Sequence, residues 1–385
     1  MKRRSNSVFL TILASVLSLA APTRYGGLHA QEADDAGRSL PTLKDAVGDR
    51  FKMGVAVSDD VADRREKWPL ITRHFEIVTP ENCMKPNAVQ PSEGQFKFET
   101  ADRFVAFARE RDLELVGHCL VWAQDDDTDE WWTKEGDGPT SPEKLLERMK
   151  LHIETVVSRY ADSVSMWDVV NEALADGQEG YLQDSVWSRT TGEEFIARAF
   201  EYTHAADPDA LLIYNDYHCF KPEKRAKLVR LIKSMQARGV PIHAFGLQGH
   251  FELHDMPYEQ LEKTFDTARE LGVKVVISEL DIDVMNRSKW WADGNKYREE
   301  LASFDPYKDG LPEDVQQQLA EAYGRLFEIF ARNSDVIARV SFWNLHDGES
   351  WLNYFPWDRT NHPLLFDRQL EPKPAYAAVI KALQQ

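Results

Sequence analysis

Short apolar segments that alternate with helical patterns constrain the fold of this chain more than any other feature. An apolar run of this length, bounded by turn residues, is typical of a buried strand. We predict eight such strands, at Phe51–Val57, Phe75–Thr79, Leu113–Val121, Val164–Val170, Leu211–Asn215, Ala244–Gln248, Val273–Ser278 and Val340–Trp343.

The segments between these strands show helical spacing. Apolar residues within 228–235 fall at i, i+3, i+4 and i+7, and residues 145–160 carry another apolar helix face. Ser141, followed by a proline, predicts a helix N-cap. Thr191 and Glu194 have the spacing of a capping box, so we predict a second helix start there.

Strands that alternate with helices favour a parallel sheet. Eight such units, without a G-x-G-x-x-G pattern at the first strand, favour a closed (β/α)₈ TIM barrel over an open doubly wound sheet. We therefore predict an α/β fold with one domain. Extended loops follow the third and seventh strands, at 124–140 and 283–312.

The N-terminus has the pattern of a targeting segment. A basic start, an apolar stretch and small residues predict a secretory signal peptide over residues 1–30, with cleavage near residue 20 also open. The stretch is too short and too interrupted by hydroxyl residues for a membrane span. We expect an exported protein, secreted or periplasmic, with a poorly ordered leader at 31–45 and the barrel domain at 46–385.

The charge balance limits the classes of partner. The chain has a net charge of −18, and an acidic surface disfavours nucleic acid and anionic membranes as partners. It suits an exported protein that acts on a neutral substrate. Cys83, Cys119 and Cys219 are too few for a disulfide framework; a Cys83–Cys119 bond is conceivable, but burial as small apolar side chains is favoured.

Two predicted strands end in a glutamate. Glu172 closes the fourth strand, and Glu279 follows the seventh. In a (β/α)₈ barrel the C-terminal ends of the strands share one face, where the chemistry of such enzymes lies. Glycoside cleavage requires one carboxyl to protonate the leaving oxygen and another to act on the sugar carbon. Either glutamate alone is equally well explained by an ion pair with an arginine.

Other polar groups follow the strands. Glu81, Asn82 and Lys85 could bind sugar hydroxyls or form an ion-paired turn. His118 alone is more often a structural histidine, whereas Trp122 offers a flat platform for a sugar ring. Asp281 and Glu279 point the same way along an extended strand, so a histidine–aspartate pair could orient that glutamate.

The eighth strand leads into further aromatic and acidic residues. His346, Asp347 and Glu349 match no metal-ligand spacing, so we expect no metal and no cofactor. Trp290 and Trp291, in the loop after the seventh strand, are equally well explained as substrate contacts or as loop packing.

With these segments in order, the chain resembles family-10 glycoside hydrolases, the endo-β-1,4-xylanases. The matching motifs run from about Phe51 to Tyr376. They are Glu81-Asn82-x-Met84-Lys85, Gly94-x-Phe96-x-Phe98 with Ala101-Asp102, Gly117-His118-x-Leu120-Val121-Trp122, Trp167-Asp168-Val169-Val170-Asn171-Glu172-Ala173, Asn215-Asp216-Tyr217, Gln248-x-His250, Ser278-Glu279-Leu280-Asp281 and Trp343-x-Leu345-His346-Asp347-Gly348-x-Ser350-Trp351.

The resemblance implies retaining endo-hydrolysis of β-1,4-xylosidic bonds in xylan or xylo-oligosaccharides by a monomer. Glu172 would be the acid/base and Glu279 the nucleophile, supported by His250 and Asp281. The implied substrate-binding residues are Glu81, Asn82, Lys85, His118, Trp122, Asn171, Tyr217, Gln248, Trp343 and Trp351.

Two positions depart from the family pattern. Ala123 stands where a histidine usually follows the third-strand tryptophan, and the spacing to Gln124 is shorter. Asn344 places a side chain where the usual pattern has glycine. The alternatives to a xylanase are a β-1,4-glucanase or mannanase of similar architecture, a non-catalytic xylan-binding barrel, and a metal-dependent hydrolase.

Overall fold

A computed structural model describes residues 40–292 and 296–385 of the 385-residue chain. The predicted signal peptide and residues 31–39 of the predicted leader lie outside the described residues. Within the described part, no helix is both long and apolar enough to cross a membrane.

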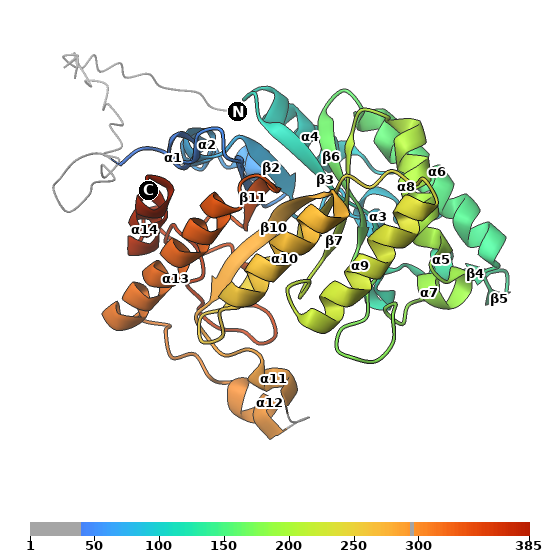
Figure 1. The fold of residues 1–385 in the computed structure, drawn as a ribbon. Coiled ribbons are helices and arrows are strands. Elements are labelled where there is room, and N and C mark those ends of the chain that lie inside the picture. Colours follow the sequence, from blue (N-terminus) through green and yellow to red (C-terminus); the bar gives the residue numbers. More distant parts are fainter. Residues whose placement is uncertain (1–39, 293–295) are drawn as a thin grey trace, which may run out of the picture. The chain divides into compact units, whose positions relative to one another are not determined.

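The core of the described domain is a closed barrel of parallel strands (Figure 1). Each strand pairs with the next in the chain, and β11 pairs with both β10 and β1, which closes the ring. The barrel strands are β1 Lys52–Val57, β2 Ile77–Pro80, β3 Glu114–Trp122, β6 Val164–Asn171, β7 Leu211–Asp216, β8 Ala244–Leu247, β10 Lys274–Asp283 and β11 Ile337–Trp343. The predicted (β/α)₈ barrel is therefore confirmed, and each of the eight strands overlaps a predicted segment, although some ends differ.

The seventh barrel strand is longer than predicted. β10 continues to Asp283, whereas the sequence pattern indicated an end at Ser278. A short strand that was not predicted, β9 His250–Glu252, pairs with residues 281–283 and extends the sheet at this point. Glu279 consequently lies inside a strand rather than after its end.

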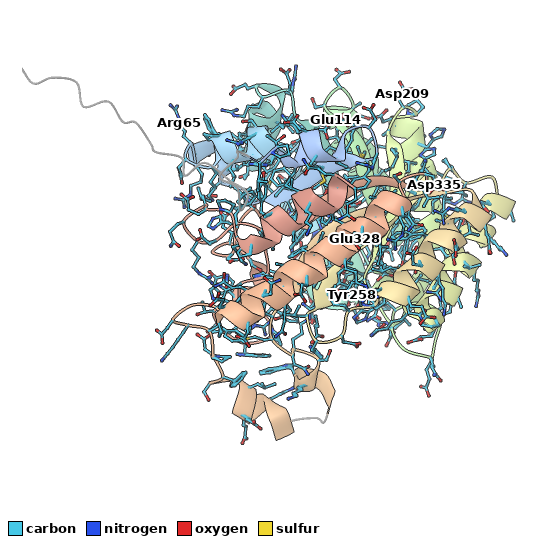
Figure 2. The ribbon with its side chains drawn as sticks, turned by 60° about the vertical axis from the view of Figure 1, so that its left-hand side comes forward. Arg65, Glu114, Asp209, Tyr258, Glu328 and Asp335 are labelled. Carbon is cyan, nitrogen blue, oxygen red and sulfur yellow. The ribbon has the colours of Figure 1, made fainter. Side chains whose placement is uncertain are left out.

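Helices cover the outside of the barrel (Figure 1). In Figure 2, α13 lies across the front of the domain with Glu328 on it, and its buried face includes Leu326, Phe327 and Phe330. The helices are α1 Leu43–Val47, α2 Trp68–His74, α3 Pro86–Val89, α4 Glu99–Arg109, α5 Glu130–Thr133, α6 Pro142–Tyr160, α7 Val186–Thr191, α8 Glu194–Ala206, α9 Pro222–Ala237, α10 Tyr258–Leu271, α11 Lys289–Ala292, α12 Lys296–Leu301, α13 Glu313–Arg332 and α14 Pro374–Leu383.

The two predicted helix starts have different outcomes. Ser141 caps α6 and accepts a hydrogen bond from the backbone N–H of Lys144, as predicted. The capping box predicted at Thr191 is wrong. Thr191 is the last residue of α7, because Gly192 follows as the C-cap with a positive φ of 62°. The capping box forms instead between Ser185 and Ser188, at the start of α7.

The ordered domain begins earlier than residue 46, so the predicted extent of the leader is wrong for residues 43–45. α1 runs from Leu43 to Val47, and both of these side chains are fully buried. Tyr376 of α14 donates a hydrogen bond to the carbonyl of Pro41 at 2.8 Å, so the start of the domain is attached to its last helix.

The loops after β3 and β10 are long, as predicted, but they contain short elements. The loop after β3 holds α5 and a small hairpin, β4 Lys134–Glu135 with β5 Gly138–Pro139. The loop after β10 holds α11 and α12. Trp290 stacks on Trp357 with ring centroids 5.4 Å apart, which favours loop packing for this residue; the side chain of Trp291 lies outside the described residues. All three cysteines are free and buried, as favoured.

Candidate active site

Three amide side chains connect Glu172 to Glu279 at the C-terminal face of the barrel. Gln248 donates one hydrogen bond to Oε1 of Glu172 at 3.0 Å and another to Oδ1 of Asn171 at 3.2 Å. Asn215 donates to the same Oδ1 of Asn171 at 2.9 Å and to Oε1 of Glu279 at 2.7 Å. The structure thus brings the two glutamates into one site, although 107 residues separate them in the sequence.

Glu172 stands on a strained turn at the end of β6. Its φ is 57°, in the left-handed region that non-glycine residues rarely adopt and that often marks functional positions. Oε2 accepts hydrogen bonds from Nε1 of Trp122 at 3.0 Å and from Nε2 of Gln124 at 3.3 Å. These donors and Gln248 are neutral, and together they fix the orientation of the carboxyl.

Glu279 has a charged neighbour instead. Nε2 of His250 lies 3.0 Å from Oε2 of Glu279, and Nδ1 of the same ring lies 3.0 Å from Oδ2 of Asp281. The indole N–H of Trp351 donates to that Asp281 oxygen at 2.7 Å. The predicted shared orientation of Glu279 and Asp281 is therefore present, with His250 bridging the two carboxylates.

These contacts decide the charge states. Burial alone would lower the pKa of His250, but the negative charges of Asp281 and Glu279 outweigh it and raise the pKa to about 9. Burial opposes ionisation of Glu279, yet the hydrogen bond and positive charge of His250 give a net lowering of its pKa. At neutral pH Glu279 is ionised, and the protonated His250 is the positive charge beside it.

Asn215 is a site residue whose role the sequence did not predict. Its amide N–H group contacts Glu279 and Asn171, while Ser278 donates to its Oδ1 at 2.6 Å and fixes which end of the amide faces the carboxylate. The sequence did place Asn215 at the end of a predicted strand, beside Asp216 and Tyr217, and this position could have indicated a site residue. Its partners come from other strands.

A group of polar residues borders the site at the end of β2. Lys85 donates to Oδ1 of Asn82 at 2.9 Å, and its ammonium lies 4.7 Å from the ring centroid of Trp122. Glu81 accepts a hydrogen bond from Asn344 at 3.0 Å. Burial raises the pKa of Glu81, and the charge of Lys85 opposes that rise.

The remaining predicted site residues make contacts among themselves and with buried charged groups. Nδ1 of His118 lies 2.9 Å from Asp168, and its ring meets the ring of Trp343 edge-on with centroids 5.3 Å apart. Both rings are nearly buried. Tyr217 lies over the ammonium of the buried Lys224, 3.5 Å from the ring centroid.

The residues considered for a metal site have other partners. Lys373 binds Asp347 at 2.9 Å, and Lys67 forms an ion pair with Glu349. His346 lies 3.4 Å from Glu349. Across residues 40–292 and 296–385, no group of three or more His, Cys, Asp or Glu side chains has an arrangement that could hold a metal ion.

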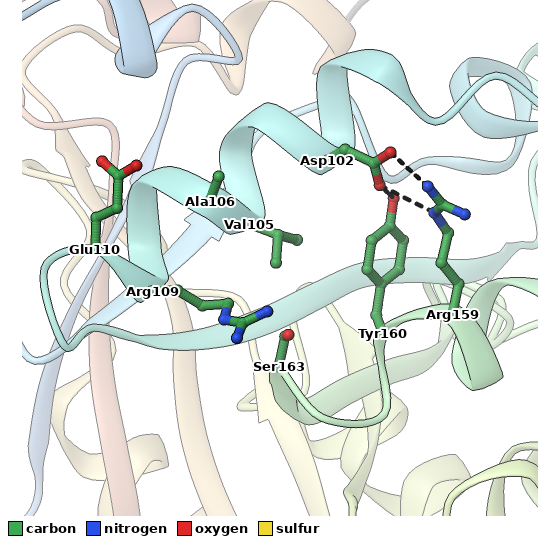
Figure 3. Close-up of a pocket in the computed structure, with 8 residues that line it drawn as sticks. All are labelled: Asp102, Val105, Ala106, Arg109, Glu110, Arg159, Tyr160 and Ser163. Atoms are coloured by element: carbon green, nitrogen blue, oxygen red, sulfur yellow. Dashed lines mark hydrogen bonds and ion pairs between the residues drawn. The ribbon is translucent and has the colours of Figure 1, made fainter.

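A hollow of about 750 Å³ lies elsewhere on the surface (Figure 3). It is formed by α4, by the last residues of α6 and by Ser163, which precedes β6. Figure 3 shows Asp102 bound by Arg159 and Tyr160, so the charges at one end of the hollow are already paired. None of the carboxylates linked by the amide network lines it, and we do not assign the active site there.

Comparison with known proteins decides the family. The family model described as "Glycosyl hydrolase family 10" matches residues 42–382. The chain belongs to glycosyl hydrolase family 10. It is 39% identical to an endo-1,4-beta-xylanase of Geobacillus stearothermophilus over 345 residues, which covers 89% of this chain and 98% of the relative.

Other family-10 relatives agree in extent and fold. A thermostable celloxylanase of Thermoclostridium stercorarium is 35% identical over 379 residues, covering 96% of this chain and 93% of the relative. The solved structure of a GH10 endoxylanase from a sugarcane soil metagenome superposes with a TM-score of 0.81 at 39% identity, covering 89% of this chain and 99% of that one. Xylanase XynB of Paenibacillus barcinonensis, solved with a conduramine derivative, also gives 0.81, at 33% identity, with 89% and 98% covered.

Proposed function

We propose that this protein is an endo-1,4-β-xylanase that cleaves internal β-1,4-xylosidic bonds of xylan with retention of configuration. The amide network that ties Glu172 to Glu279 carries the proposal, because glycoside hydrolysis needs two carboxyl groups on one sugar linkage. We infer the substrate from the similar proteins, which are named xylanases.

The environments of the two glutamates support different roles for them. Glu279, ionised beside His250, is the nucleophile and attacks the anomeric carbon while the bond to the leaving oxygen breaks. Glu172, held by neutral donors, gives its proton to that oxygen. In the second step Glu172 removes a proton from water, whose oxygen displaces Glu279 from the anomeric carbon.

The other polar groups bind the sugars. Glu81, Asn82, Lys85 and His118 contact hydroxyl groups of the glycone, the sugars on the non-reducing side of the cleaved bond. Gln248 also binds the glycone, and Asn171 holds the 2-hydroxyl of the sugar that is being cleaved. The aromatic walls are Trp122, Tyr217, Trp343 and Trp351. Xylose lacks an exocyclic hydroxymethyl group, so a site narrowed by Trp343 and Trp351 would exclude glucose sterically.

Replacement of Glu279 tests the mechanism. Glu279→Ala should abolish xylan hydrolysis, and azide should restore turnover by attacking the anomeric carbon in place of the lost carboxylate. Glu270→Ala, which removes an exposed glutamate from α10, is the matched control and should keep full activity. Full activity in Glu279→Ala would overturn the assignment.

The stereochemistry and the substrate need separate measurements. Proton NMR of the first products should show the β-anomer; an α-anomer would mean inversion and a water molecule between the two carboxyls. Initial rates on xylan should exceed those on carboxymethyl-cellulose and mannan. The comparison with cellulose is included because one relative is named a celloxylanase.

The cellular context is also a proposal. Residues 1–30 are a secretory signal peptide, and the mature protein is a monomer outside the cytoplasm that binds xylan and not nucleic acid or membranes. The acidic net charge of −18 supports this. N-terminal sequencing of exported protein and light scattering would test export and the monomer; an intact N-terminus or a dimer would contradict them.

A further inference from the structure

We propose that Asn344 is a positioning residue that holds the Glu81 carboxylate and the Trp351 loop in register for binding the glycone. The proposal rests on the function proposed above and adds a residue where the family pattern has glycine. Asn344 follows β11 directly and is fully buried.

The Asn344 side chain contacts two separate parts of the site. Its Nδ2 group donates a hydrogen bond to Oε2 of Glu81 at 3.0 Å. Its Oδ1 accepts from the backbone N–H of Trp351 at 3.3 Å. One amide therefore connects the end of β2 to the loop that carries Trp351, whose indole in turn binds Asp281. Both ends of the amide have a partner, so its orientation is fixed.

The backbone at this position makes the choice of residue informative. Asn344 has a φ of 79°, in the left-handed region where glycine is strain-free and asparagine is among the tolerated residues. A glycine here would satisfy the backbone but would leave Glu81 and the Trp351 N–H without this partner. A side chain at this position therefore costs conformational energy relative to glycine, and the two hydrogen bonds of Asn344 offset that cost.

The charges around Glu81 show what the Asn344 bond does. Burial raises the pKa of the Glu81 carboxyl, and the negative charges of Asp59 and Glu349 raise it further. Lys85 and the Asn344 hydrogen bond oppose this, because each favours the ionised form. Loss of the Asn344 amide should therefore raise the pKa of Glu81. As the pH is lowered, the carboxylate that accepts hydrogen bonds from sugar hydroxyls should then become protonated at a higher pH than in the parent.

Two variants separate the role of the side chain from that of the backbone. Asn344→Gly keeps the left-handed geometry and deletes both hydrogen bonds. It should raise KM for xylan about tenfold, as expected for one charge-assisted hydrogen bond, and leave kcat within about twofold. Asn344→Asp keeps the shape and the acceptor for Trp351 but faces Glu81 with a second carboxylate. It should move the acidic limb of kcat/KM to higher pH, beyond the shift in Asn344→Gly.

A third variant tests whether the shift of the acidic limb arises from Glu81. In a Glu81→Gln background the residue no longer titrates, so adding Asn344→Asp should not shift the acidic limb. Tm is measured for every variant, because a purely structural role would lower Tm without a selective change in KM. An unchanged KM and pH profile in Asn344→Gly overturns the proposal, and so does a shift that persists without Glu81. Xylan hydrolysis and azide rescue in the parent enzyme are tested separately, so failure of the proposed function would be recognised independently.

Discussion

His250 and Glu279 form a buried ion pair at the centre of the site, with Nε2 of the ring 3.0 Å from Oε2 of the carboxylate. The pair is held by a third group, because Asp281 binds the opposite ring nitrogen and raises the pKa of His250 to about 9. A cation fixed in this way keeps Glu279 ionised despite its burial.

Removal of the Asp281 charge should shift the pH dependence of activity. In Asp281→Asn the pKa of His250 falls, so the cation beside Glu279 is weakened and the lowered pKa of Glu279 rises. A nucleophile is active above its pKa, so the acidic limb of kcat/KM should move to higher pH. A pH–rate profile on xylan measures this. An unchanged acidic limb would show that Asp281 does not act through His250.

Gln124 should contribute to turnover through Glu172. Gln124→Ala removes the N–H donor that lies 3.3 Å from Oε2 of that glutamate. We expect kcat to fall about fivefold, the equivalent of one neutral hydrogen bond of about 1 kcal/mol. Gln317→Ala, on the exposed side of α13, is the control and should leave kcat unchanged. If both variants match the parent, Gln124 does not position the acid.

Gly246 should be needed for the position of Asn215. A Cβ atom at Gly246 would overlap Oδ1 of Asn215, whose amide donates to Glu279. Gly246→Ala should therefore lower kcat at least tenfold and destabilise the fold by about 1–3 kcal/mol through overpacking. Gly324→Ala is the control: its Cβ would meet Ala378 at 3.6 Å, an ordinary contact, and alanine in helix α13 should stabilise by up to about 1 kcal/mol. Kinetics and urea denaturation measure both.

Lys224 and Asp216 form a fully buried ion pair at 2.7 Å. Lys224→Met should cost about 3–5 kcal/mol of unfolding free energy at pH 8, because it leaves a buried charge without a partner. Adding Asp216→Asn should recover part of that loss, as a double-mutant cycle in urea would show.

The same pair predicts a pH effect with a definite sign. Burial raises the pKa of Asp216 to about 6, and Lys224 opposes this, so without Lys224 the pKa rises further. Between about pH 4 and that raised pKa, the folded state then binds more protons than the unfolded state, so stability falls as pH rises through this range. Lys224→Met should consequently lose less stability at pH 5 than at pH 8. An equal loss at both would contradict the account.

Local patterns in the sequence were sufficient for the strands and for the two glutamates. Each barrel strand contains a largely apolar segment, and Glu172 stands directly after such a segment, so neither depends on knowing what packs beside it. The capping box predicted at Thr191 did not form, although a helix, α8, begins close by at Glu194. The capping-box spacing was present, but Gly192 already ends α7 there, and a pattern of two residues does not weigh that competing signal.

The sequence by itself determined a (β/α)₈ barrel with an acid at the end of β6 and another on β10. Only the tertiary structure decided that β10 continues to Asp283, that His250 binds two carboxylates at once, and that Asn215 and Asn344 connect groups from different strands. The physical reason is how far apart in the sequence the interacting residues lie. Apolar periodicity is set by each residue's neighbours in the chain, whereas these hydrogen bonds join residues 29–263 positions apart, which meet only when the barrel closes.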